Sequence, residues 1–303
     1  MSAGARLVTA AAGFLVLLNV TSAEDLQQRP VFRAGADVIV VHVTVVQKGT
    51  PQPGLIARDF ELLDNGVHQE VELISEQRVP LDVSLVVDAG WRVTDEVRGT
   101  TIDEQRFVES IRAVANLLRP PDRLGLVRFR SDIREDLPLS VVPVQVHPEP
   151  IPGYWSALDD AVVQAMLRPS PPGRRHIIVV FTDGVDVGSV LTPLDVTNLV
   201  VRCDAAVYVV LDRHRGARGM LASSGNPVVV QMLRDVARET GGEVLSESDV
   251  PAALKKVLSS AEHGYVLTYV PQGVTKAGWH EIKVTVTRPG SFDVRARRGY
   301  VWQ

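Results

Sequence analysis

Residues 83–88 of the chain are Val-Ser-Leu-Val-Val-Asp, and residues 176–183 are His-Ile-Ile-Val-Val-Phe-Thr-Asp. Both runs are almost continuously apolar, which is typical of parallel strands buried on both faces of a sheet. Each run ends in an aspartate that leads into a glycine-containing turn. Because ligands of open parallel sheets bind beyond the carboxyl ends of the strands, Asp88 and Asp183 are candidate site residues if these two strands are neighbours.

The segment around these runs alternates between strand-like and helix-like patterns. Apolar residues at helical spacing predict helices that alternate with further short apolar strands. The expected helices cover residues 103–118, 156–167, 193–202, 227–240 and 250–261. Such alternation predicts a doubly wound, mostly parallel α/β sheet over residues 81–262.

The two segments that flank this region have a β texture. Residues 24–80 contain a β-branched run and an Asp-Asn-Gly turn at 64–66, and three strands are expected after Gly264, at 265–270, 280–287 and 292–296. Neither segment is long enough to build a core by itself. We therefore expect residues 24–80 and 263–303 to pack together as one β-sandwich-like platform.

The first 23 residues have the pattern of a secretory signal peptide. Arg6 precedes an apolar run at residues 7–18, and small residues follow up to Ala23, where we expect cleavage. The run is shorter than the roughly 20 residues that a spanning helix needs. The sequence thus predicts an exported protein, periplasmic or secreted, with no membrane span in the mature chain; a buried helix is the alternative for this segment.

Composition excludes several functional classes. The chain of 303 residues has a net charge of −4 and a single cysteine, which argues against a nucleic-acid partner and against a disulfide-stapled fold. The chain contains no phosphate-binding loop, dinucleotide-binding motif or nucleophile elbow, and its seven histidines have no zinc-site spacing. Cys203 precedes an apolar run and is expected to be buried and inert. We therefore predict that the chain is not an enzyme.

Several motifs, in order along nearly the whole mature length, resemble one family. The span from about residue 83 to 261 resembles the von Willebrand factor A domain, and the mature chain is similar to the bacterial VWFA-related proteins of the acidobacterial type. The matching pieces are residues 32–38, 55–66, 80–88 (Pro-Leu-Asp-Val-Ser-Leu-Val-Val-Asp), 182–184 (Thr-Asp-Gly) and 294–300. This resemblance implies the α/β fold already predicted and, in many members, a metal-ion-dependent adhesion site.

The adhesion site implied by the resemblance is degenerate here. Its first element is Asp-x-Ser-x-Ser, and Asp88 is kept while Gly90 and Arg92 replace the two serines. Ser156 matches the hydroxyl ligand of the second element, and Asp183 matches the aspartate of the third. Glycine has no side-chain oxygen and arginine is always protonated, so neither can bind a cation.

Two interpretations of this site follow. In the first, Arg92 pairs with Asp88 and Asp183 and takes the place of the ion, so that no cofactor is needed; the two acids could also cap the following turns through backbone N–H groups. In the second, Asp88, Ser156 and Asp183 remain a residual Mg²⁺ site. Mg²⁺ is thus a possible cofactor, and we favour the site without it.

Aromatic residues near the same edge suggest a protein partner. Trp91 and Arg92, together with Tyr154 and Trp155, are candidate partner-binding residues, because exposed Trp and Arg are enriched in interface hot spots. A Trp91 side chain folded onto its own loop is the alternative. The arginines at 295, 297 and 298 are expected to form a solvent-facing row.

The sequence therefore favours an exported, non-enzymatic protein-binding or scaffold module with a degenerate adhesion site. A Mg²⁺-dependent adhesion module that uses Asp88, Ser156 and Asp183 is the alternative. A hydrolase or oxidoreductase is disfavoured because no set of acid, base and nucleophile is visible.

Overall fold

The computed structural model describes residues 38–75, 79–89, 109, 111–147, 149, 151–153, 155–169, 171, 173–211, 226–246 and 250–302. Residues Ala36–Gln303 form one compact unit. In the part of the chain that is described, no helix has the length and apolar character needed to cross a membrane. The expected signal peptide at residues 1–23 lies outside the described residues.

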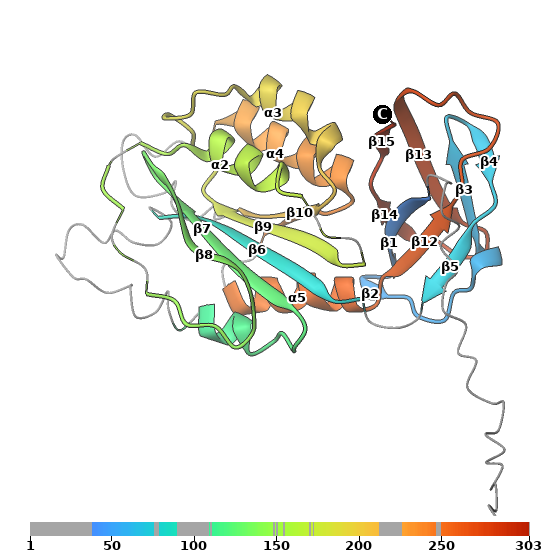
Figure 1. The fold of residues 1–303 in the computed structure, drawn as a ribbon, viewed down its shortest axis with the longest axis horizontal. Helices are drawn as coiled ribbons and strands as arrows, with labels where there is room; N and C mark the ends of the chain where they lie inside the picture. Colours follow the sequence, from blue (N-terminus) through green and yellow to red (C-terminus); the bar gives the residue numbers. More distant parts are fainter. Residues whose placement is uncertain are drawn as a thin grey trace, which may run out of the picture. The chain divides into compact units, whose positions relative to one another are not determined.

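A six-stranded sheet forms the centre of the α/β part (Figure 1). Its strands follow the order β11-β10-β9-β6-β7-β8, and all of them are parallel except β8, which runs antiparallel to β7. Every residue of β6 and β9 is buried, as expected for strands covered on both faces. The strands are β6 (Leu81–Asp88), β7 (Arg123–Phe129), β8 (Ile133–Val141), β9 (Arg175–Thr182), β10 (Ala206–Leu211) and β11 (Val244–Leu245).

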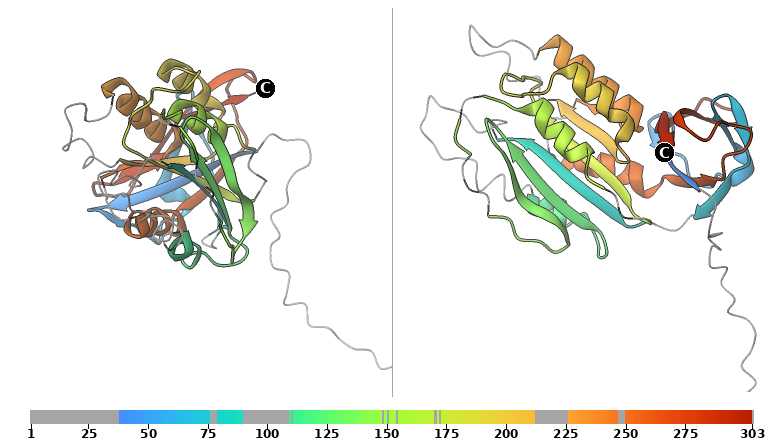
Figure 2. Two further views of the ribbon diagram at one scale, coloured as in Figure 1. Left: turned by 90° about the vertical axis from the view of Figure 1, so that its left-hand side faces the viewer. Right: turned by 45° about the horizontal axis from the view of Figure 1, so that its top comes forward.

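Helices cover both faces of this sheet. Successive residues of β6 alternate between two cores: Val83, Leu85 and Val87 belong to one and Val86 to the other. Helices α2 (Leu158–Met166), α3 (Pro193–Leu199) and α4 (Pro227–Thr240) supply the core on the Val86 side, and Figure 2 shows them together on one face. Helix α5 (Val250–Glu262) and the helical residues 111–115 cover the other face. The doubly wound α/β prediction is confirmed.

The helix ends follow from local sequence. The Thr192 hydroxyl accepts the Asp195 N–H, and the Asp195 carboxylate accepts the Thr192 N–H, which forms a capping box at the start of α3. Asn226 caps α4 by accepting the Val228 N–H, and Gly241 ends that helix in the left-handed conformation with φ of 81°. The short 3-10 segment η2 (Val200–Arg202) continues α3.

The two flanking segments build two further sheets. One has the order β14-β1-β12-β5, with β2 paired to β1, and the other has the order β15-β13-β3-β4. Both contribute to one apolar cluster that includes Val43, Leu62, Leu267 and Ile282, so the expected β-sandwich-like platform is present. The elements are β1 (Ile39–Gln47), β2 (Thr50–Pro51), η1 (Ala57–Asp59), β3 (Phe60–Asp64), β4 (Val67–Gln69), β5 (Glu72–Ser75), β12 (Tyr265–Tyr269), β13 (Gly278–Val286), β14 (Asp293–Ala296) and β15 (Gly299–Trp302). The domain boundaries at residues 80/81 and 262/263 stay a prediction.

Two expectations for the C-terminal segment are wrong. It contains a fourth strand, β15, which pairs with β13. The arginines at 295 and 297 do not form a solvent-facing row, because Arg295 pairs with Glu243 at 2.7 Å and Arg297 with Asp204 at 3.0 Å. Both acids come from the α/β part, so these arginines are held at its contact with the platform.

A buried polar cluster ties the platform together. The Asp64 carboxylate accepts hydrogen bonds from Tyr269 at 2.8 Å and Tyr300 at 2.9 Å, and it contacts His280 Nδ1 at 2.7 Å. The side chains of Asp64 and His280 are fully buried. Because the four residues come from β3, β12, β13 and β15, this one carboxylate connects strands of both sheets.

Candidate functional site

Strand order places Asp88 and Asp183 at the same edge of the central sheet. From β6 the chain goes to β7 on one side and later to β9 on the other, so the order reverses between β6 and β9. These strands are parallel neighbours, with Val87 opposite Phe181. Asp88 ends β6, and Asp183 directly follows β9. The two acids therefore lie at the topological switch point, where α/β sheets bind ligands.

Ser156 contacts the first of these acids. It precedes α2, and its hydroxyl donates to Asp88 Oδ2 at 3.5 Å. Its carbonyl oxygen accepts the N–H groups of Val187 at 3.1 Å and Gly188 at 2.9 Å, which fixes the loop after β9 against the loop before α2. Two of the three predicted ligand residues are thus in contact.

Asp183 caps its own turn. Its Oδ1 accepts the Val185 N–H at 3.0 Å, and the Thr182 hydroxyl accepts the Gly184 N–H at 3.0 Å. Gly184 has φ of 80°, a conformation that glycine adopts without strain. This agrees with the interpretation that Asp183 holds the turn through backbone N–H groups.

Sequence analysis missed a second group of acids beside this edge. Asp186 accepts the Asp159 N–H at 2.8 Å, and Ser189 donates its hydroxyl to Asp186 at 2.5 Å. Asp160 accepts the N–H groups of Val190 and Leu191, both at 2.9 Å. Asp159, Asp160, Asp186 and Ser189, which we call the acidic brace, fasten the loop after β9 to the first turn of α2. The available sequence clue was the pair of acids just inside a predicted helix start.

Asp159 is the member of the acidic brace with the most perturbed protonation. It is buried, and its Oδ1 has no hydrogen-bond partner. Burial, reinforced by the charges of Asp186 and Asp160, raises the pKa of the Asp159 carboxyl to about 7. Near neutral pH this position is therefore partly protonated, which lowers the negative charge beside the edge.

Exposed apolar side chains gather on the loops and helix starts at this edge. Trp155 is 60% exposed and precedes Ser156, while Val190 is 90% exposed and lies in the loop that the acidic brace holds. A Cβ at Gly188 would lie 3.1 Å from the Trp155 Cβ, so the two loops meet closely there. We call the exposed set of Trp155, Val187, Val190, Leu194 and Val228 the apical patch.

The remaining predicted residues cannot be placed. Gly90, Trp91, Arg92 and Tyr154 lie outside the described residues, so the proposed pairing of Arg92 with the acids stays a prediction. Within the described part of the chain, no group of three or more His, Cys, Asp or Glu is arranged to hold a metal ion. Asp88 and Ser156 provide oxygen atoms in contact, whereas one oxygen of Asp183 is already used by its turn. The described donor set therefore fits a cation only in part.

Comparisons with known proteins concern the fold. No family model and no curated protein matches the chain. Proximal thread matrix protein 1 from the mussel byssus is 12% identical, with a TM-score of 0.43, over 61% of this chain and 48% of that chain. The chain thus spans about half the length of the mussel protein.

Two microbial structures are similar over more of the chain. The ArnB paralog VWA2 from Sulfolobus acidocaldarius is 10% identical over 88% of this chain and 76% of that one, with a TM-score of 0.41. A von Willebrand factor type A protein from Catenulispora acidiphila is 10% identical over 90% of this chain and 76% of that one, with a TM-score of 0.40. At such low identity and TM-score, no residue role in this chain is derived from these structures.

Proposed function

We propose that the chain is an exported, non-enzymatic binding or scaffold module of the von Willebrand factor A type. It engages a protein partner through the loops at the carboxyl edge of its α/β sheet, without requiring a metal ion. The observation that carries the proposal is the apical patch, which lies next to the switch point. Sites on such sheets are built at this edge.

The chemistry of the apical patch suits a protein ligand. Trp155 offers a large rigid surface, and tryptophan is among the residues that contribute most to interface affinity. Val187 and Val190 lie on the loop that the acidic brace and the Ser156 carbonyl hold in place, whereas Leu194 and Val228 lie in the first turns of α3 and α4. Loops fixed before binding lose less conformational freedom when they bind, so more of the contact energy remains as affinity.

The Ser84–His176 pair and the Cys203 thiol, which could in principle perform nucleophilic catalysis, are both buried. Ser84 and His176 lie 3.0 Å apart, but both are buried inside the central sheet, and burial lowers the pKa of His176 to about 4. Burial raises the pKa of the Cys203 thiol to about 12, which keeps it protonated at neutral pH. These environments support a binding role rather than catalysis.

The apical patch is tested by variants with a matched control. The variant Trp155→Ala/Val190→Ser removes apolar surface at the edge, and Trp279→Ala/Val141→Ser makes the same exchange at exposed positions elsewhere. Proteins captured by the wild type, identified by mass spectrometry, should include one that the first variant loses and the control keeps. Retention of every captured protein by both variants would refute the proposed surface.

Metal dependence separates the favoured function from the alternative. The contact of Ser156 with Asp88 supports the alternative of a residual Mg²⁺ site, because carboxylate and hydroxyl oxygens are ligands of the kind that Mg²⁺ takes. A ligand that binds only the native state raises the melting temperature. We expect no change in melting temperature or in partner capture with Mg²⁺ or EDTA. A Mg²⁺-induced rise that disappears in Asp183→Ala would establish the alternative instead.

Export has a separate test. The proposal rests on the charge, apolar run and small residues of positions 1–23. Mass spectrometry of the protein from its native host should find an N-terminus at Glu24. An intact N-terminus in the cytoplasmic fraction would contradict export and leave the binding surface unaffected.

A further inference from the structure

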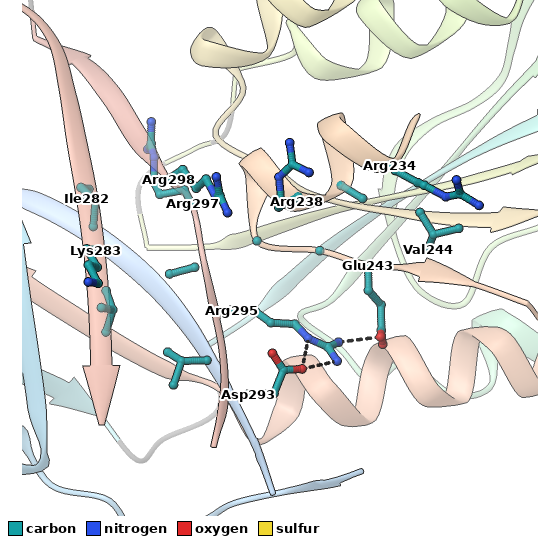
Figure 3. Close-up of a pocket in the computed structure, with 16 residues that line it drawn as sticks. Arg234, Arg238, Glu243, Val244, Ile282, Lys283, Asp293, Arg295, Arg297 and Arg298 are labelled. Carbon is teal, nitrogen blue, oxygen red and sulfur yellow. Dashed lines mark hydrogen bonds and ion pairs between the residues drawn. The ribbon is translucent and has the colours of Figure 1, made fainter. Parts of the chain in front are cut away.

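A pocket of about 570 Å³ lies where the C-terminal end of α4 meets strands β11, β13 and β14 (Figure 3). Its volume is within the range of ligand sites. Helix α4 begins next to the Gly184 turn, where the Asn226 N–H donates to the Gly184 carbonyl, and it rises about 10 Å before Arg234, its first residue that lines the pocket. The pocket is therefore a separate place from the apical patch.

The pocket follows the edge of a strand. Its lining includes all six consecutive residues 293–298, as well as 241–244 and 282–284. Side chains alternate between the two faces of a strand, so a pocket over one face would be lined by every second residue. Lining by consecutive residues instead indicates a pocket that lies along the edge of the strand. Within the described chain, β14 pairs with β1 alone. The other edge of β14 therefore presents backbone N–H and C=O groups toward the pocket.

The side chains around this edge are strongly cationic. The lining contains six cationic and two acidic residues in a chain whose net charge is −4. Both acids are bound by one cation, since Arg295 contacts Glu243 at 2.7 Å and Asp293 at 2.6 Å. The other cations are Arg234, Arg238, Lys283, Arg297 and Arg298.

Two of these cations are available to a ligand. Arg234 on α4 and Lys283 on β13 are exposed and form no ion pair with any other described residue. Arg238 and Arg298 also reach solvent, although each contacts Glu239. Arg234 and Lys283 come from different elements and lie on opposite sides of the pocket, so an anionic ligand meets positive charge at either end (Figure 3).

We propose that this pocket binds an acidic peptide segment in extended conformation, added as a strand to the free edge of β14. In strand addition, main-chain hydrogen bonds supply affinity and alternate side chains supply specificity. Carboxylates of the peptide meet the cationic rim, and the side chains between them meet Val244, Val284 and Val294. This site is independent of the partner surface proposed above.

The length of the added strand is limited at one end. A Cβ at Gly241 would lie 2.7 Å from the Ala296 carbonyl carbon, so the α4 cap packs directly on the end of β14. The free edge is therefore Asp293–Arg295, which spans roughly 10 Å. Only about three residues of the peptide pair with β14.

The test uses fluorescein-labelled hexapeptides and fluorescence anisotropy on the full chain. An alternating Glu-Val peptide should bind at least about tenfold more tightly than its Gln-Val counterpart and weaken as salt is raised. N-methylation of alternate backbone nitrogens should abolish its binding, because those N–H groups form the strand pairing. The proposal would be overturned if the Gln-Val peptide bound as tightly as the Glu-Val peptide. It would also be overturned if the N-methylated Glu-Val peptide bound as tightly as the unmethylated one. Complete displacement of the peptide by inorganic phosphate, with a dissociation constant for phosphate equal to that of the peptide, would also overturn the proposal. Such displacement would indicate a simple anion site.

Charge-reversal variants locate the binding. Arg234→Glu/Lys283→Glu should weaken Glu-Val binding at least about tenfold, whereas Arg112→Glu/Lys276→Glu, with the same charge change at exposed positions outside the lining, should have a much smaller effect. Both variants should keep the wild-type melting temperature. Equal weakening by both would overturn the proposal. The Trp155→Ala variant should bind the peptide as wild type does, which distinguishes this site from the apical patch.

Discussion

Asp159 combines burial with a neighbouring pair of acids, and this makes it sensitive to pH. Its pKa, raised to about 7, lies above that of an unfolded aspartate, so the native state keeps a proton that the unfolded chain has released. The free energy of unfolding therefore falls as pH rises from about 4 to about 7, and the full penalty is present above that range.

Asp159→Asn should remove this penalty. We expect a gain of about 1–2 kcal/mol at about pH 8 and almost none at about pH 4, measured by urea unfolding. Asp160→Asn is the control, because the Asp160 carboxylate accepts two N–H groups and its loss should destabilise the protein at pH 8. A gain for Asp159→Asn that is the same at both pH values would contradict the titration.

Asp64 connects both sheets of the platform through three buried side-chain contacts. Its removal leaves two buried hydroxyls and a buried imidazole without their partner. We expect Asp64→Ala to cost about 3 kcal/mol or more, whereas Tyr300→Phe, which removes one hydrogen bond, should cost about 1 kcal/mol. Equal and small losses in urea unfolding would show that the cluster is not the centre of the platform's stability.

The residues of the candidate site differ in how well the sequence predicts them. Asp88 and Asp183 could be placed at one edge because each follows a continuous apolar run, and the fold then brings the two strands together. The acidic brace could not be found, because it depends on the loop after β9 meeting the first turn of α2. The hydrogen bond from the Asp159 N–H to the Asp186 carboxylate arises from tertiary contact between the loop and the helix, and no sequence spacing predicts it.

Among the secondary-structure elements, the end of α4 requires a glycine for two separate reasons. Gly241 has φ of 81° and also lies against the Ala296 backbone, so a side chain there meets both strain and collision. Gly173 has φ of 75° with no atom within 4 Å of its would-be Cβ. Gly173→Ala should therefore cost about 1 kcal/mol from conformation alone, and Gly241→Ala at least about 1 kcal/mol more. Similar losses in thermal unfolding would mean that the cap can move away from β14.

Element boundaries were predictable where the chain marks them chemically. Helix α4 begins at Pro227, directly after its cap Asn226, and ends before Gly241, so its predicted range of 227–240 matches the structure. Strand β15 was missed because it is only four residues long and the sequence pattern before it suggested a charged row. The arginines of that row depend on Asp204 and Glu243, which are distant in sequence, so their burial could not be read from local alternation.

At the scale of the whole molecule, the arginines after Asp293 join the platform to the α/β part. Arg295 is 20% exposed and its partner Glu243 is 19% exposed, whereas Arg298 is 55% exposed and lies 3.6 Å from Glu239. We expect Arg295→Met to cost about 2 kcal/mol, because Glu243 loses a partner in a half-buried position, and Arg298→Met to cost less than about 0.5 kcal/mol. Equal effects in urea unfolding would show that Arg295 does not hold the two parts together.

The strand partners of β1 also determine when the platform can finish folding during synthesis. Val43 is opposite Tyr265 and Ala296, which follow it by roughly 220 and 250 residues. At a synthesis rate of about 5–20 residues per second, β1 waits on the order of 10–50 s after translation for its neighbours. During that interval β1 has only the two-residue strand β2 beside it, and Val41, Val43 and Val45, all completely buried in the finished protein, lack the cover of β12 and β14. The earliest described strand to be made is thus among the last to be completed, and its valines stay without their neighbours until the final forty residues are made.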